Sequence, residues 1–331
     1  MRLILALVAL LPLPALADST RSIVDEHILP GFAALAETTQ TLQSTAAETC
    51  TRGDPLNTAY NTAFDAWITV SHLRFGPTEQ EDRAFALAFW PDSRGATPKA
   101  LSRLIANADP VVETADTYAE VSIAARGFFA LEFLLYDAAF ADQGDADYRC
   151  QLIQTITADI AAVSDAMQQD WQNDYAAKLI EPSADSPYRT PAEATQELFK
   201  ALSTGLQFTS ENRLGRPLGT FDKPRPNRAE ARRSARSLRH VELSLTSLKS
   251  LALALAADAP DIQEKLDQRF TKAIDVAARV DDLSFAGVAD PGTRIKVEAL
   301  QSAVESIRQA VALDLGPHLG VSVGFNALDG D

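Results

Sequence analysis

Apolar residues recur along the chain at intervals of three and four, the spacing that places them on one face of an α-helix. A clear example is the seam formed by Leu238, Val241, Leu245, Leu248, Ala252 and Leu255. The pattern predicts helices over residues 22–49, 56–73, 97–107, 110–138, 150–179, 191–211, 227–257, 260–280 and 292–313. No strand-type alternation of any length is present. We therefore predict an all-α fold built from two helical bundles in tandem.

Three stretches interrupt the helical pattern. Proline and serine between Glu181 and Pro191 mark the best candidate for a boundary between the bundles. We place the N-terminal bundle at 18–185 and the C-terminal bundle at 186–331. Residues 213–226 are dense in glycine, proline and arginine and are predicted to form an irregular loop, and the glycine-rich tail from Gly316 is predicted to be weakly structured.

Residues 1–17 have the pattern of a secretory signal peptide: a basic start, a short apolar run and small residues at the end. We expect cleavage after Ala17 and a mature chain in the periplasm or outside the cell. The residue after Ala17 is not a cysteine, which argues against a lipid anchor. No later segment has a clean apolar run of about 18 residues, so no transmembrane segment is predicted.

The chain is acidic, with 45 Asp and Glu against 30 Lys and Arg. This balance argues against nucleic acid or an anionic membrane as a partner. The two cysteines, Cys50 and Cys150, are predicted to form a disulfide because the compartment is oxidising. A metal-binding or nucleophilic pair is the alternative, but neither cysteine lies in a Cys-x-x-Cys motif or beside a histidine.

One carboxylate, Glu132, lies in an almost wholly apolar stretch from Arg126 to Tyr136. On a helix its neighbours three and four residues away are Phe128, Phe129, Leu135 and Tyr136. A carboxylate in such surroundings loses hydration, so it must be neutralised, paired or bound to a cation. We predict a buried polar site at Glu132; a glutamate that reaches a wet edge of the bundle is the alternative. Gly127, in the same predicted helix, is explained by a close approach of another helix.

A second polar group lies at one end of the seam in the predicted helix 227–257. Continuing the seam towards the N-terminus places Glu230, Ser234 and Ser237 at inward-facing positions. The surrounding segment 213–239 is strongly basic, with nine cationic residues: Arg213, Arg216, Lys223, Arg225, Arg228, Arg232, Arg233, Arg236 and Arg239. Three interpretations stay open: a solvated face that pairs with acids elsewhere, a loop that recognises an anion, or the cations that neutralise Glu132.

The chain lacks the local motifs of common enzyme and metal sites: His-Glu-x-x-His, a P-loop, Gly-x-Ser-x-Gly, paired Cys-x-x-Cys and the helical Glu-x-x-His pairs of di-iron bundles. Its histidines are far apart in the sequence, and none pairs with another at i+3 or i+4: His27, His72, His240 and His318. We predict no catalytic residue and no metal site built from neighbouring ligands, with Glu132 as the only weak candidate for a metal ligand.

Four stretches resemble the imelysin family, helical proteins of bacterial envelopes that are associated with iron acquisition and grouped formally with the metallopeptidases. They are His72–Pro77, Phe89–Asp92, Gly127–Glu132 and Glu230–Ser237, and the resemblance spans most of the mature chain. The family motif at the third stretch is Gly-x-His-x-x-Glu. Gly127 and Glu132 match it, but Phe129 stands where the histidine belongs.

The resemblance implies two four-helix bundles packed against each other, with a ligand site at their junction. It implies that Glu132 faces Glu230, Ser234 and Ser237, with further site residues nearby: His72, Arg74, Trp90, Asp92, Gly127, Phe129 and Arg233. A histidine and a glutamate three residues apart on one helical face can share a metal ion, and Phe129 removes the nitrogen ligand. We therefore expect a polar pocket in which this motif holds no metal.

The function that the resemblance implies is a non-enzymatic periplasmic binding or accessory protein of iron uptake. Its partner would be a small ligand or another envelope protein of iron uptake, with iron or an iron chelate as the cofactor to test. Two alternatives stay open. One is metallopeptidase activity, which the missing motif histidine disfavours, and the other is a cleft that binds an anionic or peptide ligand through the segment 213–239.

Overall fold

The computed structural model describes residues 19–321, and within this range every regular element is a helix. The longer α-helices are α2 (Leu29–Glu48), α3 (Asp54–Val70), α5 (Ala96–Asn107), α7 (Gly127–Tyr136), α8 (Ala146–Asp170), α10 (Pro191–Gln207), α12 (Ser237–Leu255), α13 (Pro260–Ala277) and α14 (Pro291–Ala310). The shorter ones are α4 (Arg83–Leu87), α6 (Ala115–Tyr118), α9 (Ala176–Ile180), α11 (Gly215–Leu218) and α15 (Gly316–His318). The predicted all-α fold is confirmed.

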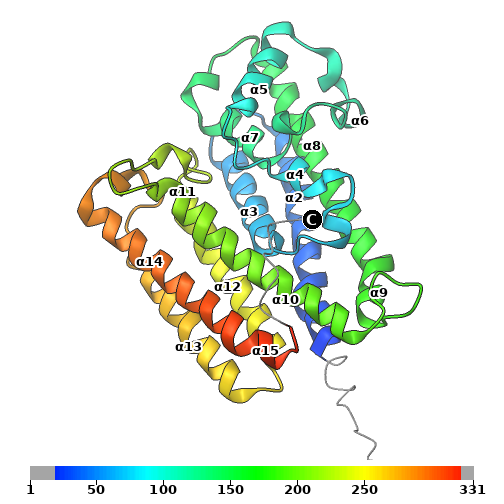
Figure 1. Ribbon diagram of the computed structural model, residues 1–331. Coiled ribbons are helices and arrows are strands. Elements are labelled where there is room, and N and C mark those ends of the chain that lie inside the picture. Colours follow the sequence, from blue (N-terminus) through cyan, green and yellow to red (C-terminus); the bar gives the residue numbers. More distant parts are fainter. Residues whose placement is uncertain (1–18, 322–331) are drawn as a thin grey trace, which may run out of the picture.

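The N-terminal bundle packs α2, α3, α7 and α8 around one aromatic core. α2 contacts both α3 and α8, and helices α5 and α6 lie towards the end of the bundle that holds α7 (Figure 1). Phe64 of α3 and Phe128 of α7 stack with ring centroids 4.6 Å apart, and Phe32 of α2 stacks on Trp171 at 5.5 Å. These rings join the four helices because each is contributed by a different part of the chain.

The C-terminal bundle packs α10, α12, α13 and α14 beside the first one (Figure 1). The predicted seam of α12 is buried, with Leu245 fully buried and Leu248 1% exposed. Phe270 of α13 and Leu300 of α14 are likewise fully buried. The 3–4 spacing of apolar residues therefore identified the core face of these helices correctly.

The two bundles meet through α3, α10 and α12. Ser247 of α12 donates a 2.6 Å hydrogen bond to the carbonyl oxygen of Thr69 in α3. Gly205 of α10 allows a close approach, because a Cβ there would lie 2.8 Å from His72 Cβ and 2.7 Å from Leu248 Cδ2. No helix within residues 19–321 is long and apolar enough to cross a membrane.

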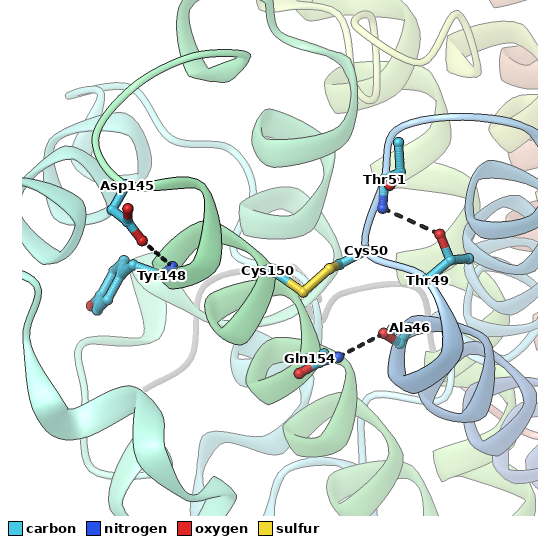
Figure 2. Close-up of a disulfide and its surroundings, with 8 residues drawn as sticks. All are labelled: Ala46, Thr49, Cys50, Thr51, Asp145, Tyr148, Cys150 and Gln154. Atoms are coloured by element: carbon cyan, nitrogen blue, oxygen red, sulfur yellow. Dashed lines mark hydrogen bonds between the residues drawn. A yellow bond between two sulfur atoms is a disulfide. The ribbon is translucent and has the colours of Figure 1, made fainter.

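The predicted disulfide between Cys50 and Cys150 is formed and links the end of α2 to the first turns of α8 (Figure 2). Gln154, one turn further along α8, donates a 3.1 Å hydrogen bond to the carbonyl oxygen of Ala46 (Figure 2). The bridge spans 100 residues, so it removes much conformational entropy from the unfolded chain, worth about 4–5 kcal/mol in the chain-entropy model.

The prediction of one long helix over 110–138 is wrong. Only α6 and α7 are α-helical there, joined by turns and short 3₁₀ segments at Pro110–Glu113 and Ile123–Ala125. Gly127 opens α7 with a φ of +73°, and a Cβ there would lie 2.2 Å from the carbonyl oxygen of Leu87. The close approach predicted for Gly127 is real, but it is made at a helix start and in a left-handed conformation that L-residues rarely adopt.

The start predicted for the helix 227–257 is also wrong, because α12 begins at Ser237. Residues 229–236 instead form a compact turn in which Ala231 and Ala235 have φ values of 46° and 54°. Alanine favours helices, so tertiary contacts override its local preference here. In the preceding segment 213–226 the irregular prediction holds only in part, because α10 continues through a π-helical stretch, Phe208–Leu214, into α11.

The predicted signal peptide 1–17, its cleavage site and the tail beyond residue 321 lie outside the described residues. Residues 181–190 contain no helix. The division of the chain at 185/186 stays a prediction.

Candidate functional site

A cavity of about 450 Å³ lies where the two bundles meet, a volume typical of small-molecule sites. The N-terminal half contributes side chains from α3, α4, α7 and the loops that follow α3 and α4. The C-terminal half contributes side chains from α10, the π-helical stretch after it, the turn at Glu230, and α12. Five of the predicted site residues line this cavity: His72, Arg74, Trp90, Phe129 and Glu230.

Aromatic rings form one wall of the cavity. Trp90 lies nearly parallel to Phe129, with ring centroids 6.4 Å apart and an interplanar angle of 23°. Phe208 meets Trp90 edge-on, at 5.8 Å and 75°. Guanidinium groups cover two of these rings: Arg213 lies 4.9 Å from the centroid of Phe208, and Arg216 lies 5.7 Å from that of Trp90. Such cation–π contacts combine flat apolar surface with positive charge.

A buried ion pair between Arg213 and Glu230 also lines the cavity. Arg213 Nε donates a 2.7 Å hydrogen bond to Glu230 Oε2, and both residues are 4% exposed. His240 Nδ1 lies 3.1 Å from the same oxygen. Burial alone would raise the pKa of Glu230, but the nearby charges and hydrogen bonds of Arg213 and His240 outweigh it and lower the pKa from 4.5 to about 2. Glu230 is therefore ionised, and its charge is held by this pairing.

Two histidines meet at the edge of the cavity. His27 Nε2 lies 3.0 Å from His72 Nε2, a hydrogen bond that requires one ring to donate and the other to accept. Burial lowers the pKa of His27 to about 4, and burial together with repulsion from His27 and Arg213 lowers the pKa of His72 well below 6.5. Both rings are therefore neutral at pH 7, and one can accept the hydrogen bond that the other donates.

Glu132 is buried, as predicted, and is only 1% exposed. One of its oxygens accepts two hydrogen bonds from Ser234, 2.9 Å from the backbone nitrogen and 2.7 Å from Oγ. Burial raises the pKa of Glu132, although the bonds from Ser234 and the charges of Arg233 and Arg232 act in the opposite direction. The contact joins the two halves of the chain next to the cavity, but Glu132 is not among the residues that line it.

The remaining predicted site residues have other contacts. Asp92 accepts hydrogen bonds from the backbone nitrogens of Ala96 and Thr97, each 2.8 Å long, and so caps the start of α5. Arg233 pairs with Asp137 at 2.7 Å. The structure also places Ser237 Oγ 2.5 Å from the carbonyl oxygen of Glu230, to which it donates.

Comparison with known proteins identifies the family. The model of the imelysin family, Peptidase_M75, matches residues 28–311, which is most of the chain. The chain belongs to the imelysin family. It is 24% identical to iron-regulated protein A of Synechococcus elongatus over 323 residues, covering 91% of this chain and 86% of that one.

Solved structures of imelysin-like proteins share the fold. An imelysin-like protein from Psychrobacter arcticum matches with a TM-score of 0.79 and 20% identity, covering 93% of this chain and 98% of that one. A protein from Parabacteroides distasonis, described as a candidate iron-regulated protein A precursor, matches with a TM-score of 0.74 and 13% identity, covering 89% and 94%. The predicted imelysin-like architecture is therefore confirmed.

The motif region of this imelysin-family chain offers a poor donor set for a metal. Phe129 occupies the position of the motif histidine, and its ring lines the cavity with carbon atoms. Glu132 is directed to Ser234 instead. Within residues 19–321 no group of three or more His, Cys, Asp or Glu side chains is arranged to hold a metal ion. The motif residues present here therefore do not fit a metal.

The basic segment 213–239 divides into two groups. Four arginines pair with acids: Arg213 with Glu230, Arg233 with Asp137, and both Arg236 and Arg239 with Asp65. The first interpretation holds only in part, because the pair of Arg213 and Glu230 is buried and lies within the segment itself. The other five form no ion pair within residues 19–321: Arg216, Lys223, Arg225, Arg228 and Arg232. The segment thus anchors the second bundle to the first and still presents unpaired positive charge.

Sequence reasoning missed part of this arrangement. Phe85, Phe208 and Lys200 line the cavity, and His27 reaches it through His72. The spacing of Lys200 on the helix offered no signal, because an exposed lysine on an amphipathic helix is the ordinary case. The contact of His27 with His72 joins residues 45 apart in sequence, so no local pattern reveals it.

Proposed function

We propose that this imelysin-family protein serves iron uptake in the bacterial envelope as a binding protein without enzymatic activity, and that its ligand occupies the cavity between the bundles. The predicted signal peptide supports the location. The iron link is supported by the name of the Synechococcus relative, iron-regulated protein A.

The cavity carries this proposal. It combines a volume of about 450 Å³ with an aromatic wall and charged groups held in fixed positions by buried pairs. Ligand sites in proteins are mostly apolar, with a few well-placed polar groups that fix orientation. Because the cavity lies between two bundles, a bound ligand would also stabilise their packing.

A variant that fills the cavity tests the proposal. Thr204 lines the cavity on α10, and its hydroxyl group bonds only to carbonyl oxygens of its own helix. Thr204→Trp should therefore occupy the ligand space with little loss of helix stability. The matched control is Thr62→Trp on α3, where an exposed threonine makes the same hydrogen bond to the residue four positions earlier.

In iron-poor medium, we expect a strain that lacks the gene to grow more slowly and the wild-type strain to express the gene more strongly. The wild-type protein and Thr62→Trp should restore growth, and Thr204→Trp should not. Normal growth of the deletion strain in iron-poor medium, or full rescue of its growth by Thr204→Trp, would overturn the proposal. Purified protein should show no turnover of a peptide library, with or without a chelator.

A further inference from the structure

The charged side chains that line the cavity are balanced by charges of opposite sign. Arg74 is paired with Glu79, and Arg213 with Glu230. Lys200 and Glu197 lie one helical turn apart on α10, where the positive charge of the lysine acts on the carboxylate. These groups leave no net charge for a ligand to neutralise. Any preference of the cavity for a charged ligand must therefore come from a charged residue next to these lining residues.

Arg216 is that residue. Its guanidinium carbon lies 5.7 Å from the centre of the ring of Trp90, which lines the cavity, although Arg216 itself is not among the lining residues. Its Nε atom is buried and has no hydrogen-bond partner among residues 19–321, and the side chain forms no ion pair there. A buried donor without a partner costs about 1–3 kcal/mol, so a ligand that offers a hydrogen-bond acceptor to Arg216 Nε would recover this free energy.

A neighbouring cation, Arg228, further favours an anionic ligand at Arg216. After burial, the like charge of Arg228 is the main cause that lowers the pKa of Arg216. Arg228 is exposed and also lacks an ion pair within the described residues. Two adjacent guanidinium groups without a carboxylate are arranged to accept an anion, because guanidinium groups bind carboxylate and related oxyanions in bidentate fashion.

The flat wall beside Arg216 determines the rest of the ligand. Trp90, Phe129 and Phe208 present ring surface, and Trp90 is nearly parallel to Phe129. A planar ring that lies against Trp90 would bury apolar area and gain stacking energy, and an acidic substituent at its edge would meet Arg216. Phe129, which stands in place of the motif histidine, contributes to this wall instead of to a metal.

We propose that the cavity binds a planar aromatic molecule that carries an acidic group, with the ring against Trp90 and the acid on Arg216. This inference rests on the proposed function for the location of the ligand, and it specifies the chemical class. Arg216 is thus the residue that selects an acid over a neutral or cationic aromatic molecule, and Arg228 strengthens the local field.

The test uses 2-naphthoate as the probe, with 2-naphthamide and 2-naphthylmethylammonium as its neutral and cationic counterparts and cyclohexanecarboxylate as the non-aromatic acid. Calorimetric titration of the full mature chain should show one naphthoate bound per chain, at least about tenfold tighter than each counterpart. The ratio corresponds to about 1.4 kcal/mol and lies at the low end of what a hydrogen bond to a charged group contributes.

Variants locate the charge. Arg216→Ala should weaken naphthoate binding about 10- to 100-fold, while its thermal midpoint should not fall, because the change removes a half-buried cation whose buried Nε has no partner within the described residues. Lys223→Ala is the matched control: it removes the same charge from an exposed position in the same segment, and it should change affinity less than about twofold. Thr204→Trp should abolish binding.

Four results would overturn the inference: no naphthoate binding at millimolar concentration, equal binding of the amide or the amine, an equal loss in Lys223→Ala, or unchanged binding in Arg216→Ala. Growth tests separate this inference from the proposed function. If Thr204→Trp fails to support growth in iron-poor medium and Arg216→Ala supports it fully, the cavity is functional but its ligand is not an aromatic acid. If both support growth, the proposed function itself is wrong.

Discussion

The ion pair between Arg213 and Glu230 allows a sharp prediction, because both residues are only 4% exposed and neither side chain can exchange its partner for water. Glu230→Gln keeps the shape of the side chain and removes its charge. The arginine then remains buried without a counter-charge, which destabilises the protein more than replacing both partners with apolar residues. We expect the variant to fold with a lower free energy of unfolding.

The magnitude follows from the pKa of Glu230, which falls from 4.5 to about 2 on folding. One pKa unit corresponds to about 1.4 kcal/mol, so the ionised carboxylate contributes about 3 kcal/mol at neutral pH. Measured losses for breaking a buried pair are about 3–5 kcal/mol, which agrees in size. Since the pKa of the folded state is lowered, this contribution is present above pH 4.5 and disappears as the pH falls towards 2.

Urea denaturation at pH 7 should therefore show Glu230→Gln to be about 3 kcal/mol less stable than wild type, with the gap narrowing below pH 4.5. The control is Arg213→Met combined with Glu230→Met, which removes both charges and should be less destabilising than the single change. A loss below about 0.5 kcal/mol at pH 7, or a gap that does not depend on pH, would refute this account of the pair.

Three further predictions concern other parts of the fold. Acidification from pH 6.5 towards 4 should lower the free energy of unfolding of wild type more than that of His27→Asn. The pKa of His27 is lowered in the folded state, so the unfolded chain takes up the proton first. Parallel pH profiles of the two proteins would contradict this. Gly127→Ala should cost at least about 2 kcal/mol in thermal unfolding, since it combines a left-handed φ with a backbone clash, whereas wild-type stability would show that the loop can yield. Replacing Cys50 and Cys150 with serine should lower the free energy of unfolding by about 4–5 kcal/mol, and reduction of wild type should reproduce that loss in urea titrations.

Periodicity was sufficient to predict the helices whose core faces are regular. α3, α13 and α14 were placed correctly to within a few residues, because each presents apolar side chains at helical spacing over several turns. The predicted helices 22–49 and 150–179 cover α2 and α8 together with adjoining π-helical turns and, in the second case, α9. The same rule failed at residues 110–126 and 227–236, where the composition still favours helix. There the backbone follows contacts with distant residues, which local sequence does not contain.

Two of these contacts show the cause. Arg126 is held by Asp159 of α8 through hydrogen bonds of 2.9 and 2.6 Å, so the chain must turn before α7 to reach that partner. Ser234 is held by Glu132 of α7 in the turn between Ala231 and Ala235, both at positive φ. Each partner is remote in sequence and satisfies a buried charge, which outweighs a few tenths of a kcal/mol per residue in helix propensity.

The candidate site was predictable only where a residue conflicted with its surroundings. Glu132 was identified because a carboxylate among apolar neighbours needs a partner, and Phe129 because it departs from a motif. Arg216 was one of several arginines in the same segment, and only the packed structure separates it from its paired neighbours. Sequence reasoning thus located the surplus positive charge of the segment, and packing determined which unpaired side chain lies over the cavity residue Trp90.

Phe129 and Glu132 together explain how a family motif can lose a donor while the fold stays intact. The glutamate does not need a metal to be stable, because Ser234 supplies two hydrogen bonds from the opposite half of the chain. The ring of Phe129 packs edge-on against Phe64 at 5.3 Å and faces Trp90 at 6.4 Å, so it serves both the core and the cavity wall. Replacing a nitrogen donor with an aromatic ring at this point leaves the contact between the halves of the chain in place. In the binding that we propose, this ring offers a surface for stacking in place of a nitrogen donor, and Arg216 provides the charge selectivity.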